Sequence, residues 1–299
     1  MNYRVYQVDA FTKERFRGNP AGVIANADGL SENQMQILAR ELNNSETAFI
    51  FSAEDDSHDV RVRFFTPTVE VPSCGHATVA AHYVRAIENQ LPSSNIRQKI
   101  GIGILPVEVI KEENDYRIVM TQGQIEFSKP IKGEMKESLL LSLGLNGGDL
   151  DKRCPIQLFS TGNSKVIIGI KSRVKLNSLI PNTQNLLEFN EKFPNNGYFV
   201  FTFESDNGKV LTHARMFAPQ IGIAEDPVTG NGNGPLGAYL VLNNLVEHDG
   251  KQFEFTGQQG EAIGRQGVVR VTVKIKNNLP EKVQIEGQAV IAFQTEIEI

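Results

Sequence analysis

A carboxylate stands at the junction between an expected helix and an expected strand. Glu46 ends the run Asn43-Asn44-Ser45-Glu46 and is followed directly by the apolar stretch 47–51. A carboxyl group that is partly removed from water is suited to taking a proton from carbon or returning one. A surface glutamate in a loop would show the same spacing, so this residue pattern leaves both interpretations open.

A second group of reactive residues lies in the run 72–78, where a turn leads into an apolar segment. Free amide groups at the start of a helix bind anions, and Gly75 stands at this start. The same position favours the thiolate form of Cys74. His76 could donate a hydrogen bond to an oxyanion or carry a proton. A small buried cysteine and a histidine that caps the helix are the plainer alternative.

The third group is the run 225–234, in which Glu225 and Asp226 precede glycines at 230, 232 and 234. Acidic residues before a helix often do no more than cap it. Alternating glycines indicate that the backbone approaches something closely or adopts positive φ angles. We therefore expect a ligand-binding turn here.

These groups follow two copies of one phrase. Arg63-Phe64-Phe65-Thr66-Pro67 returns as Arg215-Met216-Phe217-Ala218-Pro219, and each copy precedes a turn with glycine and then a segment of small and aliphatic residues. A strand, a turn and a buried helix are thus expected in both halves. The repeat predicts a duplicated fold with two helix N-termini, which would suit an anionic substrate.

The remaining elements are mostly strands. Short runs rich in Val, Ile and Phe extend from 3–11 to 289–298, and one of them is 100–104. The segments 77–87 and 236–246 are apolar on nearly every side, so protein must surround them. The sequence predicts an α+β fold in which a curved sheet wraps around one central helix, twice. Ser31 and Gln34 form an expected capping box at the start of an amphipathic helix.

Bulk composition excludes several classes of protein. The chain has 299 residues and a formal net charge of −5, which argues against a dedicated nucleic-acid surface. No apolar run approaches the length of a membrane span, and the N-terminus lacks a signal-peptide layout, so we expect a cytoplasmic protein. The glycine pattern at 232–237 matches that of dinucleotide-binding proteins but lacks the preceding strand, which argues against nicotinamide binding. The five histidines show no zinc-binding spacing.

Taken together, several motifs resemble those of the PhzF-like (phenazine biosynthesis) family of the diaminopimelate-epimerase-like superfamily. The resemblance covers nearly the whole chain. It rests on 9–11 with 18–21, 44–47, Arg63-x-Phe65-x-Pro67, 74–78, 225–230 and 263–265.

The resemblance implies two similar, pseudo-twofold-related domains, each a mixed β-sheet rolled into a barrel-like shape around a central helix. The first would span 1–122 together with a final strand at about 289–299, and the second 123–288. The active site would lie in the cleft between the domains. A homodimer, a small carboxylate substrate, and neither metal nor organic cofactor are also implied.

The resemblance further assigns roles to residues. Glu46 matches the general acid/base of the family, while His76 and Asp226 match residues that bind substrate and assist the proton shuttle. Gly75 and Gly230 match positions where helix N-termini hold a substrate carboxylate. The remaining implied substrate-binding residues are Ser45, Cys74, Thr229 and Asn231. Asn231 stands where the phenazine enzyme has serine, which leaves the substrate open.

The racemases of the superfamily use two cysteines that face each other across the substrate. Cys74 occupies the first position, but Thr229 occupies the second, and a hydroxyl group is too weak an acid or base for that role. We therefore expect an isomerase that moves a carbon-bound proton by means of Glu46. The alternatives are a one-thiol epimerase that pairs Cys74 with Glu46, and a metabolite-binding protein without turnover.

Overall fold

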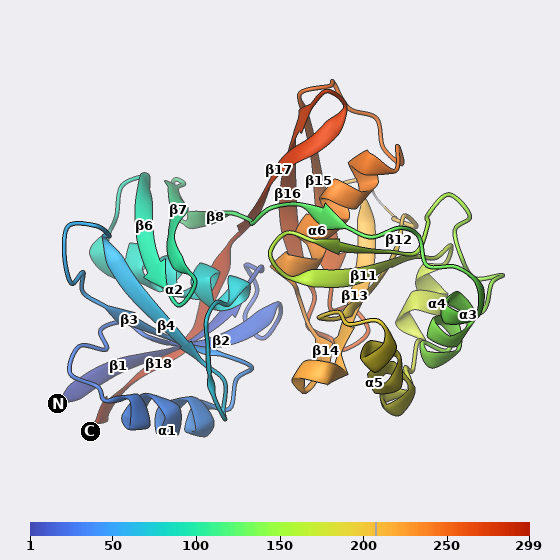
Figure 1. Cartoon of the computed structure of the whole chain (residues 1–299). Helices are drawn as coiled ribbons and strands as arrows, with labels where there is room; N and C mark the ends of the chain where they lie inside the picture. Colours follow the sequence, from blue (N-terminus) through green and yellow to red (C-terminus); the bar gives the residue numbers. More distant parts are fainter. Residues whose placement is uncertain (207) are drawn as a thin grey trace. The chain divides into compact units, whose positions relative to one another are not determined.

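The computed structural model describes residues 1–206 and 208–299. The chain divides into two compact units. Unit 1 consists of Met1–Thr121 and Glu286–Ile299, and unit 2 of Gln122–Ile285. Figure 1 shows both units in the colours of the sequence.

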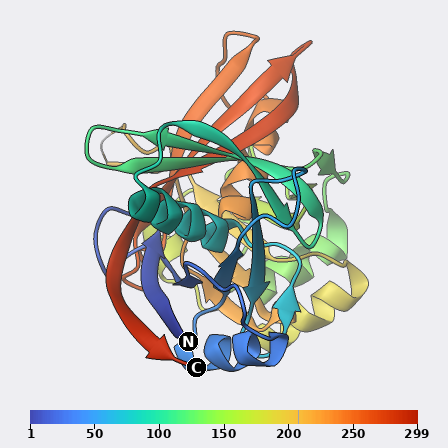
Figure 2. The same cartoon turned by 90° about the vertical axis from the view of Figure 1, so that its left-hand side faces the viewer.

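Unit 1 is a mixed sheet whose first and last strands come from opposite ends of the chain. Its strands are β1 (Asn2–Ala10), β2 (Asn19–Ile24), β3 (Thr47–Phe51), β4 (Val60–Phe65), β5 (Glu70–Val71), β6 (Ser94–Ile100), β7 (Gly103–Lys111), β8 (Tyr116–Thr121) and β18 (Ala289–Glu298). Strand β1 lies antiparallel between β18 and β2, and β2 runs parallel to β3. Beyond β3, β4 pairs antiparallel with β3 and β5 and parallel with β6. The two termini of the chain are therefore adjacent, as Figure 2 shows.

Helix α2 (Gly75–Asn89) is the centre of unit 1. It contacts β1, β2, β3, β7, β8 and β18, and Figure 2 shows it beside these strands. Most of its side chains are buried, including the polar Thr78 and His82. This confirms the predicted central helix, because a helix that is apolar on nearly all sides must be surrounded by protein.

Helix α1 (Glu32–Leu42) covers β3 and β4 from outside the α2 core. Its predicted capping box is present: the Ser31 side chain accepts from the Gln34 N–H, and the Gln34 side chain accepts from the Ser31 N–H. Asn43 ends the helix with φ of 50°, which turns the chain toward Glu46 and β3.

Unit 2 repeats this order of elements. Its strands are β9 (Glu126–Phe127), β10 (Gln157–Ser160), β11 (Ser164–Gly169), β12 (Tyr198–Thr202), β13 (Thr212–Ala218), β14 (Ile223–Asp226), β15 (Gln252–Gln259), β16 (Gly267–Lys276) and β17 (Leu279–Gly287), the last of which ends in unit 1. Its helices are α3 (Gly133–Ser142), α4 (Arg173–Asn177), α5 (Thr183–Lys192), α6 (Gly230–Leu242) and a 3₁₀ turn at Pro219–Ile221.

The strand pairings of the two units correspond one to one. Strand β10 pairs antiparallel with β11, β11 pairs parallel with β12, and β12 pairs antiparallel with β13. The pairings from β1 to β4 follow the same order. Strand β13 then pairs antiparallel with β14 and parallel with β15, as β4 does with β5 and β6. Helix α6 follows β14 and contacts β10, β11, β15 and β16. The predicted α+β fold with two similar domains is thus confirmed.

The predicted strand at 100–104 is wrong. Strand β6 ends at Ile100 and β7 begins at Gly103, so the middle of this run is a tight turn with φ of 125° at Gly103. Ile102 and Ile104 project into solvent, with 60% and 44% of their surface exposed. The alternation of isoleucine and glycine imitates a strand, while the real strand β6 carries polar residues on its exposed side.

The glycines at 230, 232 and 234 lie inside α6 rather than in a turn before it, and none has a positive φ. A Cβ on Gly232 would lie 2.5 Å from the Phe199 ring, and one on Gly234 would lie 1.8 Å from the Gln122 amide. Close approach to the protein's own side chains therefore accounts for these two glycines.

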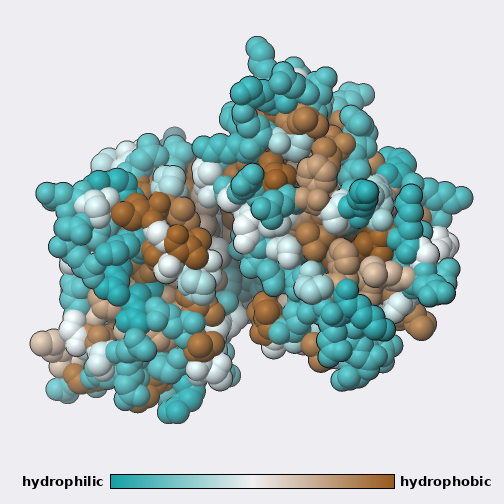
Figure 3. Space-filling model, viewed as in Figure 1, coloured by the Kyte–Doolittle hydropathy of each residue, from teal (hydrophilic) through white to brown (hydrophobic). Residues whose placement is uncertain are grey.

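The face of the molecule in Figure 3 is largely hydrophilic, with hydrophobic residues in small groups on both units. Within the described residues, no helix is long and apolar enough to cross a membrane.

Candidate active site

The repeated Arg-x-Phe-x-Pro phrase fixes the hairpin that leads into each central helix. In unit 1, the Arg63 guanidinium lies 5.1 Å from the centre of the Phe65 ring. Its Nε and Nη2 donate to the two carboxylate oxygens of Glu70, at 2.7 and 2.6 Å. Because Glu70 belongs to β5, this bidentate pair ties β5 to β4 just before α2 begins.

The same arrangement recurs in unit 2. Arg215 lies 4.9 Å from the centre of the Phe217 ring, and its Nε and Nη2 donate to Glu225 of β14 at 2.9 and 2.6 Å. Arg215 also donates to the carbonyl groups of Leu176 and Leu179. The repeated phrase is therefore structural, and it positions the two helix N-termini.

In unit 1, the residues predicted from two separate motifs, 44–47 and 74–78, come together. His76 Nε2 lies 3.3 Å from Glu46 Oε2 and 3.2 Å from Ser45 Oγ. Cys74 Sγ lies 3.5 Å from His76 Nδ1. Gly75 is the first residue of α2, and Cys74 is its N-cap residue, with no side-chain hydrogen bond to the helix. The thiol, the imidazole and the carboxylate thus surround the amide end of α2.

The carboxylate of Glu46 is unusual because one of its oxygens is buried without a hydrogen-bond partner. Oε2 has almost no exposed surface and accepts no hydrogen bond, although His76 Nε2 is 3.3 Å away. The imidazole and the carboxylate are therefore in close contact without a formed hydrogen bond. The Glu46 side chain is 15% exposed. Buried polar atoms are normally hydrogen-bonded, so this oxygen is an unsatisfied acceptor within the site.

The backbone around Glu46 is held by a pair of side-chain amides. Asn44 and Gln7 exchange two hydrogen bonds, at 2.8 and 2.9 Å, and join the end of α1 to β1. The Glu46 carbonyl accepts from the Gly22 N–H at 3.3 Å. Gln7 was not predicted as part of the site, and no local pattern distinguishes it.

In unit 2, the predicted residues gather at the N-terminus of α6. Thr229 is the N-cap residue and Gly230 the first helical residue. The Thr229 hydroxyl donates to Asp226 Oδ2. Gln259 Nε2 donates to Thr229 Oγ1 at 3.0 Å and to the Asp226 carbonyl at 2.8 Å, while Gln259 Oε1 accepts from the Thr229 N–H. Gln259 therefore fixes this turn, although no local sequence pattern distinguishes it.

Asn231 is held by a second residue that the sequence did not indicate. Gln122 Nε2 donates to Asn231 Oδ1 at 3.0 Å and to the Gly230 carbonyl at 3.2 Å. Thr161 donates in turn to Gln122 Oε1 at 2.7 Å. The three side chains form a chain of hydrogen bonds beside the start of α6.

Lys165 is a buried cation in the same unit. Only 2% of its surface is exposed, and its Nζ donates to Asn163 Oδ1 at 2.5 Å. Burial lowers the pKa of Lys165 to about 8, and the charge of Asp226 opposes this change. Lys165 lies within the otherwise apolar strand β11, and a lysine would ordinarily be assigned to the surface, so sequence reasoning missed it.

The structure therefore places the predicted residues in two groups, one in each unit. The first group is Ser45, Glu46, Cys74, Gly75 and His76, and the second is Asp226, Thr229, Gly230 and Asn231. Cys74 and Thr229 occupy the same N-cap position in corresponding helices.

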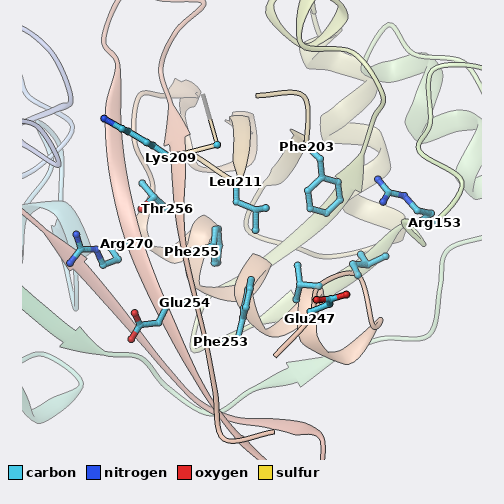
Figure 4. Close-up of a pocket in the computed structure, with 13 residues that line it drawn as sticks. Arg153, Phe203, Lys209, Leu211, Glu247, Phe253, Glu254, Phe255, Thr256 and Arg270 are labelled. Atoms are coloured by element: carbon cyan, nitrogen blue, oxygen red, sulfur yellow. The ribbon is translucent and has the colours of Figure 1, made fainter. Parts of the chain in front are cut away.

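A large hollow in unit 2 is separate from both groups. It has a volume of about 790 Å³ and is lined by residues that include Phe203, Phe253, Lys209 and Arg153 (Figure 4). Arg153 is bound to Asp151 and stacks on Phe203, so its charge is already compensated. None of the predicted site residues lines this hollow, and we do not assign it to the reaction.

Comparison with known proteins identifies the family. The model of the phenazine biosynthesis-like proteins matches residues 8–295. An uncharacterised isomerase of Clostridium acetobutylicum is 58% identical over 295 residues, which cover 99% of this chain and 98% of that protein. Trans-2,3-dihydro-3-hydroxyanthranilate isomerase of Pseudomonas aeruginosa is 30% identical over 269 residues, which cover 88% of this chain and 87% of that protein.

A solved structure agrees with this result. The phenazine biosynthesis protein of the PhzF family from Bacillus anthracis matches with a TM-score of 0.91 and 34% sequence identity, over 100% of both chains. The chain therefore belongs to the phenazine biosynthesis-like (PhzF) protein family, and the two relatives compared above are isomerases.

Proposed function

We propose that this protein moves a carbon-bound proton on a small carboxylic acid, with Glu46 as the general acid/base. The observation that carries the proposal is the buried, unpartnered Oε2 of Glu46, beside His76 and the amide end of α2. A base must have a free lone pair close to the proton that it removes, and this oxygen has one.

The chemistry requires no change of oxidation state. Glu46 takes a proton from a carbon activated by a nearby carboxylate or double bond, and the electron pair of the broken C–H bond enters an enolate. The same glutamic acid then returns the proton to another carbon, so the double bond shifts while the atoms and electrons balance. The substrate is accordingly a small cyclic or unsaturated carboxylic acid.

The N-terminus of α2 stabilises the developing charge. The first N–H groups of a helix lack partners within the helix, and the helix dipole favours an anion at that end. Removal of one preorganised donor of this kind typically raises the activation free energy by about 3–4 kcal/mol. His76, in the first turn, orients the substrate and assists proton transfer.

The second group is also part of the proposal. By their resemblance to family positions, Asp226, Thr229, Gly230 and Asn231 bind the substrate, and Asp226 assists the proton shuttle. Their support in the structure is the ordered turn at the start of α6, which Gln259 fixes.

The one-thiol epimerase is less well supported by the geometry. Two groups that act on opposite faces of one carbon each need to approach it to about 3–3.5 Å, so they stand roughly 6–7 Å apart. The reactive atoms of Glu46 and Cys74 lie within 4.8 Å of each other, on either side of His76. Such a separation leaves too little room for a carbon between them.

Deuterium incorporation tests the proposed base. In D₂O, the parent protein should introduce deuterium into candidate acids, among them trans-2,3-dihydro-3-hydroxyanthranilate, the compound named for the Pseudomonas relative. Glu46→Gln should slow this exchange by about 10²–10⁴-fold, because the amide cannot accept the proton. NMR of the recovered acid gives the rate.

A matched control is Glu41→Gln, which changes an exposed glutamate on α1 and should exchange at the parent rate. If Glu46→Gln incorporates deuterium as fast as the parent, Glu46 is not the base.

A further inference from the structure

Lys165 of unit 2 is a buried cation without a paired anion. Its Nζ donates to Asn163 Oδ1 at 2.5 Å and to the Ser164 carbonyl at 3.3 Å, and only 2% of the residue is exposed. Within the part of the chain that the structure describes, Nζ forms no ion pair with a carboxylate. An ammonium group has three N–H donors, so one of them has no acceptor there. This is unusual, because the transfer of a charge out of water is costly and buried charges are normally paired.

The sheet of unit 2 places Lys165 on the face that packs against α6. Lys165 and Ile167 share one face of β11, because side chains alternate along a strand. Ile167 pairs with Phe199 of β12. A Cβ on Gly232 would lie 2.5 Å from the Phe199 ring, so this face of the sheet contacts the first turn of α6.

The neighbours of Lys165 across the sheet lead to Asp226. A Cβ on Gly197 would lie 3.2 Å from Lys165 Cδ and 2.7 Å from Met216 Cε. Met216 of β13 pairs with Asp226 of β14. The charge of Asp226 favours the protonated form of Lys165, while Asp226 Oδ2 accepts from the Thr229 hydroxyl. The amine therefore lies near this carboxylate without a formed ion pair, at the end of the sheet where α6 begins.

The turn between β10 and β11 joins Lys165 to the same end of α6. Asn163, which accepts from Lys165, lies in this turn together with Thr161. Thr161 donates to Gln122 Oε1, and Gln122 Nε2 donates to Asn231 Oδ1. The turn that holds the amine is thus fixed to the first turn of α6.

The position of Lys165 lowers the stability of the free protein. Burial lowers the pKa of Lys165 to about 8, because its surroundings favour the neutral amine. At pH 7 the group is nevertheless mostly protonated, since this pH lies below its pKa. Groups that cost stability are typical of functional sites, where a ligand supplies the interaction that the protein lacks.

We propose that the Lys165 ammonium binds an anionic group of a small molecule at the start of α6, and that this group is the carboxylate of the substrate. An anion there supplies the acceptor that Lys165 lacks and neutralises its charge. The amide end of α6, which begins at Gly230, favours an anion at the same place. These two effects offset the repulsion by Asp226. Only the identification of the anion as the substrate rests on the proposed function.

NMR of the lysine side chains tests the proposal on the parent protein. With ¹³C-labelled lysine, the Cε signal of Lys165 reports the pKa of its amine, and its absence from Lys165→Met assigns it. Saturating benzoate, a small carboxylate probe, should raise this pKa from about 8 by about one unit or more, because a nearby anion favours the charged form. Benzamide, which has nearly the same shape and no charge, should leave it unchanged. A pKa that does not respond to benzoate overturns the proposal.

Calorimetric titration with benzoate assigns the affinity to this residue. Lys165→Met should weaken binding by roughly 10–100-fold, the usual effect of losing a hydrogen bond to a charged group. The substitution removes an unpaired buried charge, so loss of binding does not arise from a weakened fold. Lys171→Met, which changes an exposed lysine of the same unit, should bind as the parent does. Unchanged affinity in Lys165→Met overturns the assignment.

The pH dependence of benzoate binding needs no variant. The affinity of the parent protein should fall about tenfold from pH 7 to pH 9, because the amine loses its charge above about pH 8. Benzoate itself stays ionised throughout this range. An affinity that is constant between these pH values excludes the Lys165 ammonium as the anion's partner.

Deuterium exchange separates this proposal from the proposed function. In Lys165→Met, the KM of an exchanged acid should rise while kcat changes little, because the ammonium holds the carboxylate equally in the ground and transition states. If Lys165 responds to benzoate but Glu46→Gln exchanges as fast as the parent, the anion site stands and the proposed base fails. If Glu46→Gln loses exchange and Lys165 does not respond to benzoate, the anion site alone fails.

Discussion

At the scale of single residues, the site is organised by His76, which contacts Ser45, Glu46 and Cys74. Its neighbours offer two different acid/base groups, a carboxylate and a thiol. Which of them moves the proton distinguishes the proposed isomerase from the one-thiol epimerase. The two cysteines of the chain make this question accessible because they lie in different units and different environments.

We expect Cys74→Ser to keep deuterium exchange within about tenfold of the parent rate, because the proposed base is a carboxylate. Cys154→Ala is the matched control. Burial and the charge of Asp151 raise the pKa of Cys154 to about 12, so this thiol stays protonated and inert at neutral pH. Loss of exchange in Cys74→Ser, with the fold intact by circular dichroism, would favour the epimerase instead.

Lys165 provides a prediction about stability and pH. Its folded pKa of about 8 lies below the ordinary value of 10.5, so the unfolded chain binds more protons between these two values. Stability therefore increases with pH across this window, and the full penalty is present below pH 8. Lys165→Met should raise the free energy of unfolding at pH 7 by about 3 kcal/mol.

Urea unfolding of Lys165→Met and its parent at several pH values measures this effect. The advantage of the variant should shrink as the pH rises from 8 toward 10.5, because the amine is then neutral in the folded chain and removing its proton from the unfolded chain costs less as the pH approaches 10.5. An advantage that is independent of pH would show that packing rather than charge is responsible.

At the scale of elements, the Arg-x-Phe-x-Pro motif joins two strands by an ion pair in each unit, but the two pairs differ in solvent exposure. Arg63 pairs with Glu70, whose side chain is 38% exposed, whereas Arg215 and Glu225 are 8% and 12% exposed. A buried ion pair leaves an uncompensated charge when one partner is removed, but an exposed pair leaves a carboxylate that water can solvate.

Arg215→Met should accordingly lower the free energy of unfolding by about 3–5 kcal/mol, since it strands Glu225 and the carbonyl groups that accept from Arg215. Arg63→Met should cost about 1 kcal/mol. Denaturant titration of the two variants under identical conditions makes the comparison. Equal losses would contradict the argument from burial.

At the scale of the whole molecule, unit 1 needs both ends of the chain. Strand β18 pairs with β1 along its whole length, and the Phe11 N–H donates to the Gln288 carbonyl at 2.7 Å. Unit 2, in contrast, is one continuous segment, Gln122–Ile285. Removal of the last strand should therefore affect the two units differently.

Deletion of residues 289–299 exposes the edge of β1 and one side of the sheet around α2. In native-state hydrogen exchange, amides of β1 and α2 should lose protection, while amides of α6 should keep theirs. Removal of Ile299 alone, the residue that follows β18, is the control and should change little, because every pairing between β18 and β1 is retained. Retained protection in β1 after the longer deletion would disprove the dependence.

Local patterns were sufficient for the features that depend on a few neighbouring residues. The apolar surface of α2, the capping box at Ser31 and the positions of Glu46 and Cys74 could all be predicted, because burial and helix capping are encoded within one or two turns. The isoleucine–glycine alternation at 100–104 misled for the same reason, since a hairpin turn can carry the same local pattern as a strand.

Only the tertiary structure shows which distant side chains contact the site residues. Ser45 and His76 are 31 residues apart, and Gln122 and Asn231 are 109 apart, so their contacts depend on strand register and on where each helix begins. Lys165 and Gln259 have no distinguishing neighbours in the sequence, yet folding buries one and makes the other fix the turn at Asp226. Sequence determined which groups could react; the packing of distant segments decided which of them meet.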